Sequence, residues 1–213
     1  MDWTVIPRNL PFLLGGLIVS FKLAGLTLAL ALPLGTVIAL GRLSPRKWVY
    51  FPASAFVNGL RANPLILIVF WFYFLVPIII GRPLGDFVSV LIAFVVFYAA
   101  YFSEIIRAGI QSVGKGQIMA GYSTGLTYFQ TMRYIVLPPA LRHMVPLLVT
   151  QSIILFQGTT VAFIIGLKEF LHRISLLTET TLRSFELYIF AALVYLAICY
   201  SGSALSRRLE ARK

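Results

Sequence analysis

The stretch His143–Leu167, HMVPLLVTQSIILFQGTTVAFIIGL, decides the fold class, because it runs for 25 residues without a Lys, Arg, Asp or Glu. About twenty apolar residues are enough to cross the hydrocarbon core of a bilayer as a helix. Within lipid every backbone N–H and C=O group must be bonded inside its own segment, so a helix is expected here rather than a buried strand. The sequence therefore predicts an integral membrane protein.

Four further runs of the same kind lie outside this stretch. Asn9–Gly41 contains Lys22 as its one charged residue, and Ala62–Gly81, Phe87–Ser103 and Leu187–Ser206 contain none. We expect an all-α membrane protein that forms a single transmembrane domain, residues 1–213, with five transmembrane helices. The predicted spans are about 14–41, 57–80, 87–106, 143–166 and 187–206.

The composition agrees with a membrane protein and argues against other classes. Of the 213 residues 59% are apolar and 12% are charged, whereas a soluble domain carries about a quarter charged residues. The net charge of +11 would suit a nucleic-acid partner if the Lys and Arg residues were clustered on one face, but they are scattered between apolar runs. One cysteine and two histidines are too few ligands for a structural zinc site, which takes four. We expect no nucleic-acid partner and no metal.

The distribution of Lys and Arg predicts the orientation, because short cytoplasmic loops hold the excess of these residues. With the C-terminus inside, eleven of the 18 basic residues lie on the cytoplasmic side and five on the other side. Five spans then place the N-terminus in the periplasm.

Residues 107–142 form the longest stretch between spans, and this stretch is cytoplasmic in the predicted orientation. Several glycines, among them Gly121 and Gly125, interrupt its first half. Thr127 and Gln130 have the spacing of a capping box at a helix start, and that helix should end at Leu137 because Pro138–Pro139 follows. We expect two short helices joined by a glycine elbow.

Two patterns of enzymes occur in the same stretch. Gly109–Gly116 nearly matches a phosphate-binding loop, but it ends on Gly where a hydroxyl must reach magnesium, and no strand precedes it. Gly121–Gly125 matches Gly-x-Ser-x-Gly around Ser123, which functions only between a strand and a helix of a large sheet. We interpret both as accidental, and we expect no catalytic residues and no enzyme activity of this chain.

Charged residues near the spans suggest a solute path. A charge at the bilayer centre costs about 3 kcal/mol or more, so Lys22 and Arg61 should face protein or water. Lys22 could instead extend its stem to the outer headgroups. Glu104 and Arg107 have the spacing of a helical ion pair, which would neutralise both at the inner boundary. Uncharged polar residues could line the path or bond neighbouring helices; they are Gln151, Gln157, Thr159 and Thr160.

A resemblance to a known family covers nearly the whole chain. Ser103–Val113 followed by Lys115–Gln117 resembles the approach to the EAA loop of bacterial ABC importer permeases, in the branch for polar amino acids. Leu137–Ala140 is similar to that family's Leu-Pro-Gln-Ala positions, Phe156–Thr160 also looks like it, and Leu60–Leu65 resembles its Arg-x-x-Pro-Leu element.

The resemblance implies a type I ABC importer permease fold and a set of partners. These would be an ATP-binding ABC subunit dimer that holds ATP and magnesium, a second permease subunit that is identical or different, and a periplasmic amino-acid-binding protein. This chain itself would bind no cofactor. The coupling loop to the ATPase would consist of Gly116, Gln117, Met119, Ala120, Gly121, Gly125, Leu126, Leu137 and Pro138. Where the family has Glu-Ala-Ala, this chain has Met119–Gly121 and lacks the acid.

The details most resemble glutamate/aspartate importer permeases of the bacterial inner membrane. The Phe156–Gln157 pair and the run Met144–Gln151 are the similar features. They imply import of polar, acidic amino acids. A different polar or basic amino acid remains an alternative, and so does an autonomous secondary transporter, although the chain shows no duplicated broken helices.

Overall fold

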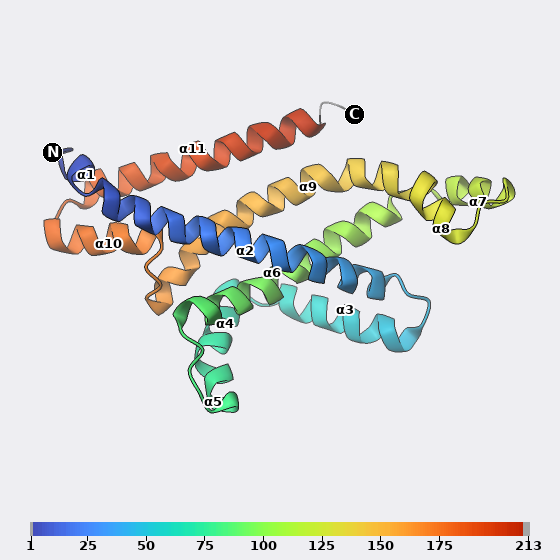
Figure 1. The fold of residues 1–213 in the computed structure, drawn as a ribbon, viewed down its shortest axis with the longest axis horizontal. Helices are drawn as coiled ribbons and strands as arrows, with labels where there is room; N and C mark the ends of the chain where they lie inside the picture. Colours follow the sequence, from blue (N-terminus) through green and yellow to red (C-terminus); the bar gives the residue numbers. More distant parts are fainter. Residues whose placement is uncertain (1, 211–213) are drawn as a thin grey trace.

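The computed structural model describes residues 2–210, and all regular structure in that range is helical. The elements in chain order are α1 Val5–Arg8, α2 Leu10–Arg42, α3 Lys47–Arg61, α4 Leu65–Phe70, the π-turn η1 Trp71–Leu75, α5 Val76–Ile80, α6 Asp86–Gln111, α7 Lys115–Ser123, α8 Tyr128–Thr131, the π-turn η2 Met132–Val136, α9 Leu137–Gly158, the 3-10 helix η3 Thr159–Ile165, α10 Phe170–Thr181 and α11 Ser184–Glu210. The long helices α2, α6, α9 and α11 follow the long axis of the molecule, with α7 and α8 at one end and α10 at the other (Figure 1).

Four helical segments are each long and apolar enough to cross a membrane. They are Leu10–Arg42, Asp86–Gln111, Tyr128–Ile165 and Ser184–Arg208. A fifth span is possible only if α3 and the segment Leu65–Ile80 are taken together. The five predicted spans all fall on these segments.

The prediction of one helix over residues 57–80 is wrong. The chain bends by 106° between α3 and the segment Leu65–Ile80, and the latter projects away from the long helices (Figure 1). Pro64 is the cause, since it is extended (φ −64°, ψ 142°) and has no N–H to continue the helix. The Asn63 side chain donates to the Gly59 carbonyl at 2.8 Å, which bonds a free carbonyl at the end of α3.

The prediction that a helix ends at Leu137 is also wrong. The helix that starts at Tyr128 continues through Pro138–Pro139 as far as Gly158, so the stretch between spans is shorter than residues 107–142. The π-turn η2 directly precedes the prolines, and they fall in the first turn of α9, where a missing N–H costs little. The wider turn thus lets the helix pass a pair of residues that normally stops it.

The core lies where α2 crosses α6. A Cβ atom on Gly35 would lie 2.8 Å from the Ala99 carbonyl oxygen and 2.9 Å from the Phe102 Cβ atom, so the two backbones approach as closely as glycine permits. The aromatic rings of Phe94 and Phe102 are fully buried beside this crossing. Close backbone approach through small residues is the usual way in which membrane helices associate.

At the opposite end from α7, helix α10 packs on α2. Gly15 and Gly16 make room for Arg173, whose guanidinium lies over the Phe12 ring and donates to the Phe12 carbonyl at 2.7 Å. The sequence analysis did not predict α10, because twelve residues with mixed polarity are too few to stand out as a span.

Candidate functional site

The first candidate site is the elbow formed by α7, the turn at Gly125 and the start of α8. Gly125 has φ +80°, a left-handed conformation that glycine adopts without strain. The predicted capping box is confirmed: the Thr127 N–H donates to Gln130 Oε1 at 2.9 Å, and the Gln130 N–H donates to Thr127 Oγ1 at 3.4 Å. The glycine elbow between two helices is therefore confirmed, although the second helix is longer than predicted.

The inner face of the elbow holds it against the long helices. A Cβ atom on Gly121 would lie 2.5 Å from Ile135 Cδ1, the end of a flexible side chain, and 3.2 Å from Thr131 Cγ2, so the two helices of the elbow approach closely at this glycine. Ile118 packs against the buried cluster that contains Val136. The elbow is thus fixed to the start of the Tyr128–Ile165 helix, and a push on it would reach that span directly.

The outer face of the elbow exposes large apolar side chains. Met119 is 64% exposed and Phe129 is 82% exposed. Of the remaining predicted coupling residues, Gly116, Gln117, Ala120, Gly125 and Pro138 are exposed, Leu126 and Leu137 are half-buried and Gly121 is buried. Exposed apolar patches of this kind mark surfaces that contact another protein or the membrane.

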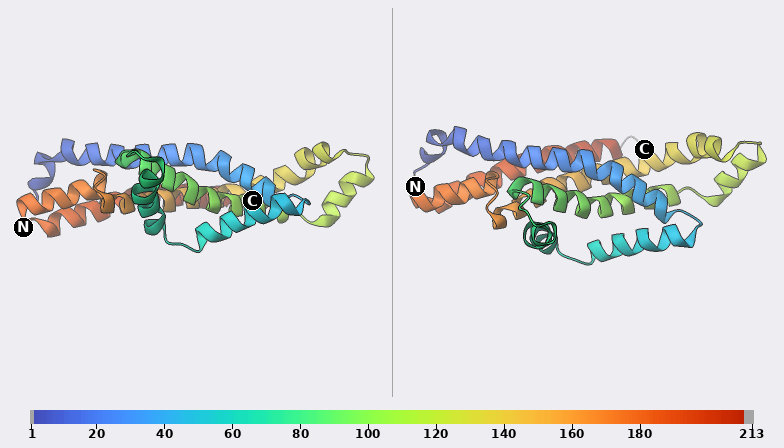
Figure 2. Two further views of the ribbon diagram at one scale, coloured as in Figure 1. Left: turned by 90° about the horizontal axis from the view of Figure 1, so that it is seen from below. Right: turned by 60° about the horizontal axis from the view of Figure 1, so that its bottom comes forward.

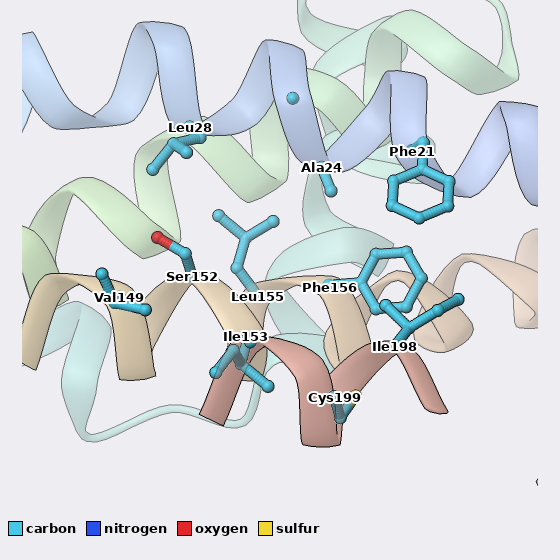
Figure 3. Close-up of a pocket in the computed structure, with 12 residues that line it drawn as sticks. Phe21, Ala24, Leu28, Val149, Ser152, Ile153, Leu155, Phe156, Ile198 and Cys199 are labelled. Atoms are coloured by element: carbon cyan, nitrogen blue, oxygen red, sulfur yellow. The ribbon is translucent and has the colours of Figure 1, made fainter. Parts of the chain in front are cut away.

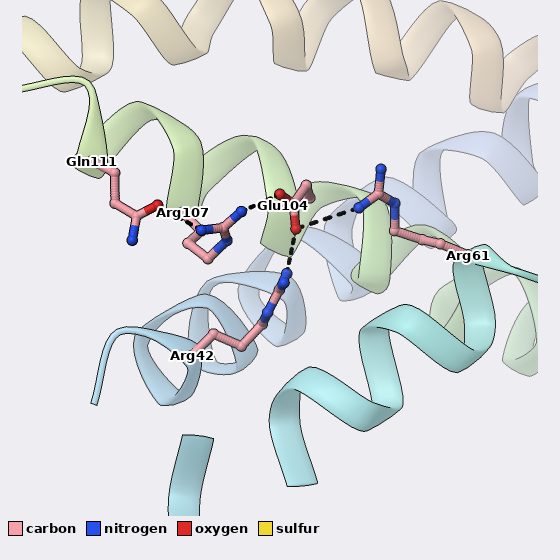
Figure 4. Close-up of polar contacts among 5 residues, drawn as sticks. All are labelled: Arg42, Arg61, Glu104, Arg107 and Gln111. Atoms are coloured by element: carbon pink, nitrogen blue, oxygen red, sulfur yellow. Dashed lines mark hydrogen bonds and ion pairs between the residues drawn. The ribbon is translucent and has the colours of Figure 1, made fainter. Parts of the chain in front are cut away.

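The second candidate site is a cluster of charges around Glu104 of α6 (Figure 4). Arg107 is in contact with Glu104, as predicted, and Arg42 at the end of α2 contacts the other carboxylate oxygen. Arg61, the last residue of α3, lies 3.4 Å from the same oxygen and 5.5 Å from the centre of the Tyr101 ring. One carboxylate therefore joins three helices, directly before the bend that follows α3.

Burial differs among the three arginines. The Arg42 side chain is 8% exposed, whereas that of Arg61 is 39% exposed. Arg42 therefore depends most on Glu104 for compensation of its charge, because it is nearly buried, whereas the guanidinium of Arg61 can still contact a solute or water. The sequence analysis missed Arg42 as a member of this cluster, because its partner is 62 positions away.

The residues predicted to line a solute path differ in burial and in the groups that they contact. The exposed Lys22 ammonium lies 5.2 Å from the centre of the Phe87 ring. The hydroxyls of Thr159 and Thr160 donate to carbonyls of their own helix, at 2.7 Å to Phe156 and 2.9 Å to Gln157. Gln151 is half-buried, and Gln157 and Arg61 are exposed.

A cavity of about 320 Å³ lies between α2, α9 and α11 (Figure 3). Its walls are almost wholly apolar, with Phe21, Leu28 and Phe156 among them, and none of the six predicted path residues lines it. A second apolar groove, about 620 Å³, lies near the elbow and includes Leu32, Phe129 and Leu141. Neither holds the polar groups that a zwitterionic amino acid needs in order to be desolvated.

A buried carboxylate that the sequence analysis missed lies at the start of α10. Glu169 is fully buried and accepts from the backbone N–H groups of Leu171 (3.0 Å) and His172 (2.7 Å) and from the Ser20 hydroxyl (3.2 Å). Burial raises the pKa of Glu169, while these hydrogen bonds act in the opposite direction. Its position just before a helical segment was the available signal, since acids often cap helix starts.

The Gly-x-Ser-x-Gly pattern has no catalytic surroundings. Ser123 is the last residue of α7, and its hydroxyl donates to the Met119 carbonyl one turn earlier, at 3.1 Å. No strand leads into it anywhere in residues 2–210. The hydroxyl therefore has an ordinary helical role.

Comparison with known proteins gives consistent results along the chain. Residues 31–213 match the model of the family described as binding-protein-dependent transport system inner membrane component. The chain is 40% identical to the glutamate/aspartate import permease protein GltK of Escherichia coli O6:H1, over 99% of this chain and 97% of that protein. It is 36% identical to the probable glutamine ABC transporter permease protein GlnP of Bacillus subtilis, over 97% and 95%. A crystal structure of an amino acid ABC transporter with histidines covers all of this chain and 99% of its own, with a TM-score of 0.93 and 29% identity.

Proposed function

Because the chain belongs to the family of binding-protein-dependent transport system inner membrane components, we propose that it is the permease subunit of an ATP-driven importer for polar amino acids, with acidic ones favoured. It is a multi-pass protein of the inner membrane. The observation that carries the proposal is the elbow, a two-helix projection at one end of the long helices (Figure 1).

The elbow is proposed to couple this chain to a separate ATPase dimer. ATP and magnesium would bind to that dimer, which closes when nucleotide is bound. Because Gly121 and Ile118 pack on the first turns of the Tyr128–Ile165 helix, movement of the elbow would tilt that span. The exposed Met119 and Phe129 side chains would supply the apolar anchors of the contact.

On the other side of the membrane, a periplasmic binding protein is proposed to deliver the amino acid. The end of the molecule that carries α1 and α10 would receive it, and a second permease, identical or different, would complete the path. None of the six candidate path residues lines the 320 Å³ cavity or the 620 Å³ groove of this chain, which suits a path that only two permeases together enclose.

The preference for acidic amino acids is proposed from two observations. The relative GltK, named for glutamate and aspartate import, shares 40% of its residues with this chain. Arg61, with its guanidinium partly exposed at the bend after α3, and Lys22 are cations that an anionic side chain could approach. The alternative is another polar amino acid, because the chain is also 36% identical to a relative named for glutamine and 30% identical to one named for arginine.

The experiment that tests this function is reconstitution with the cognate ATPase, binding protein and second permease. ATP hydrolysis is measured with binding protein loaded with glutamate, aspartate, glutamine, arginine or histidine. We expect glutamate and aspartate to stimulate hydrolysis most. Stimulation by arginine and not by glutamate would contradict the acidic preference, and the absence of any stimulation would contradict the importer itself.

A further inference from the structure

The outer face of the elbow carries bases and no acid. Between Glu104 and Glu169 the sequence contains no Asp or Glu. Lys115, Arg133 and Arg142 are exposed, and no described acidic side chain pairs with any of them. All the charge that this surface can present to a partner is therefore positive.

The bases lie beside the apolar anchors. Lys115 and Met119 are one turn apart on α7, and both are exposed. Phe129 and Arg133 are about one turn apart where α8 enters η2, and both are exposed as well. Each helix of the elbow thus has an exposed apolar side chain with a basic side chain next to it.

The elbow also extends past the neighbouring end of the bundle. In both views of Figure 2, α7 and α8 project beyond the turn that joins α2 to α3. That turn carries its own exposed bases, Arg46 and Lys47, at the place where headgroups would meet the helix ends. The bases of the elbow are therefore placed to meet a soluble partner, whereas those of the turn are placed to meet lipid.

We propose that the elbow fits a groove on the ATPase subunit that has an apolar floor and an acidic rim. The inference rests on the proposed function and adds the chemistry of the partner. Met119 and Phe129 would enter the floor, while Lys115 and Arg133 would pair with carboxylates on the rim. A groove lined with bases would repel this elbow, because opposed like charges across an interface are unfavourable.

The test measures binding of the co-expressed ATPase to the complete permease pair in nanodiscs of zwitterionic lipid. Met119→Glu and the double variant Lys115→Glu/Arg133→Glu are compared with the wild type. We expect the double variant to raise the dissociation constant about tenfold, because two rim charges are reversed. Met119→Glu should raise it by at least as much, because it puts a charge into the apolar floor next to the acidic rim. Raising the salt concentration should weaken wild-type binding and leave the double variant almost unaffected.

Lys47→Glu is the matched control, since it reverses an exposed base at the same end of the molecule but outside the elbow. We expect it to bind the ATPase like the wild type. Tighter binding by Met119→Glu, or equal binding by all variants, would overturn the acidic groove. An effect that appears only in nanodiscs with anionic lipid would mean that the bases contact headgroups, and would overturn it too. If the wild type shows no binding at all, the proposed function itself fails, which is a different result.

Discussion

The carboxylate of Glu104 is the counter-charge of three arginines. Its carboxylate compensates the nearly buried Arg42 as well as Arg107 and Arg61. The spacing of Glu104 and Arg107 within one helix made their contact predictable from the sequence. Arg42 comes from a different helix, and nothing local in the sequence indicates which helices meet.

Replacing Glu104 with Gln should destabilise the protein by about 3 kcal/mol, because Arg42 would keep a buried charge without a counter-charge. Arg61→Gln removes a more exposed partner and should cost less than about 1 kcal/mol. Thermal unfolding in detergent measures both. A Glu104→Gln variant as stable as Arg61→Gln would show that the carboxylate does not hold the three helices.

Glu169 should make stability depend on pH. Its raised pKa means that the folded protein holds this proton more tightly than the unfolded chain does. Its contribution to stability therefore falls as the pH rises from the ordinary pKa of 4.5 through the raised value. The difference in Tm between the wild type and Glu169→Gln should shrink or reverse over this interval. A difference that stays constant with pH would contradict the raised pKa.

At the scale of elements, local sequence patterns predicted most of the helices, but they did not predict which prolines interrupt a helix. Apolar length predicted four spans as continuous helices but not the 106° bend that divides residues 57–80, and the spacing of Thr127 and Gln130 predicted the start of α8. Pro64 breaks its segment, whereas Pro138–Pro139 lie just after a π-turn in a helix that continues, and Pro33, Pro52 and Pro146 lie inside α2, α3 and α9. Whether such a turn forms depends on tertiary packing, which no sequence pattern here reveals.

The elbow should not tolerate proline at Gly125. Proline requires φ near −65°, and Gly125 has φ +80°, so Gly125→Pro should open the turn and displace α7. We expect ATP-dependent uptake to fall by about tenfold or more while membrane insertion continues, since a small displacement of a positioned group costs about that much. Gly114→Ala is the control, because Gly114 has φ −61° and open space for a Cβ. Full uptake by Gly125→Pro would contradict the coupling role.

The crossing of α2 and α6 should be sensitive to a single methyl group. Gly35→Ala places a Cβ 2.8 Å from a backbone oxygen of α6, so we expect a loss of about 1–3 kcal/mol. Gly25→Ala lies on the same helix with nothing within 4 Å of the new atom and should be neutral. Thermal unfolding separates the two variants. Equal stability would mean that the helices can move apart without cost.

At the scale of the whole molecule, the predicted all-α fold of a type I ABC importer permease is confirmed by the structural match to an amino acid ABC transporter. The family membership that the resemblance implied is confirmed as well. The solute path could not be predicted to the same degree. Its candidates were chosen for polarity alone, and the hydroxyls of Thr159 and Thr160 turned out to bond their own helix.

The central claim is that this chain moves amino acids only as part of an ATP-driven assembly. The most direct test is uptake of labelled glutamate into vesicles that contain this chain, either alone or with its ATPase, binding protein and second permease. The account predicts uptake only with the full set and with hydrolysable ATP. Uptake by this chain alone, without ATP, would show an autonomous secondary transporter and contradict the account.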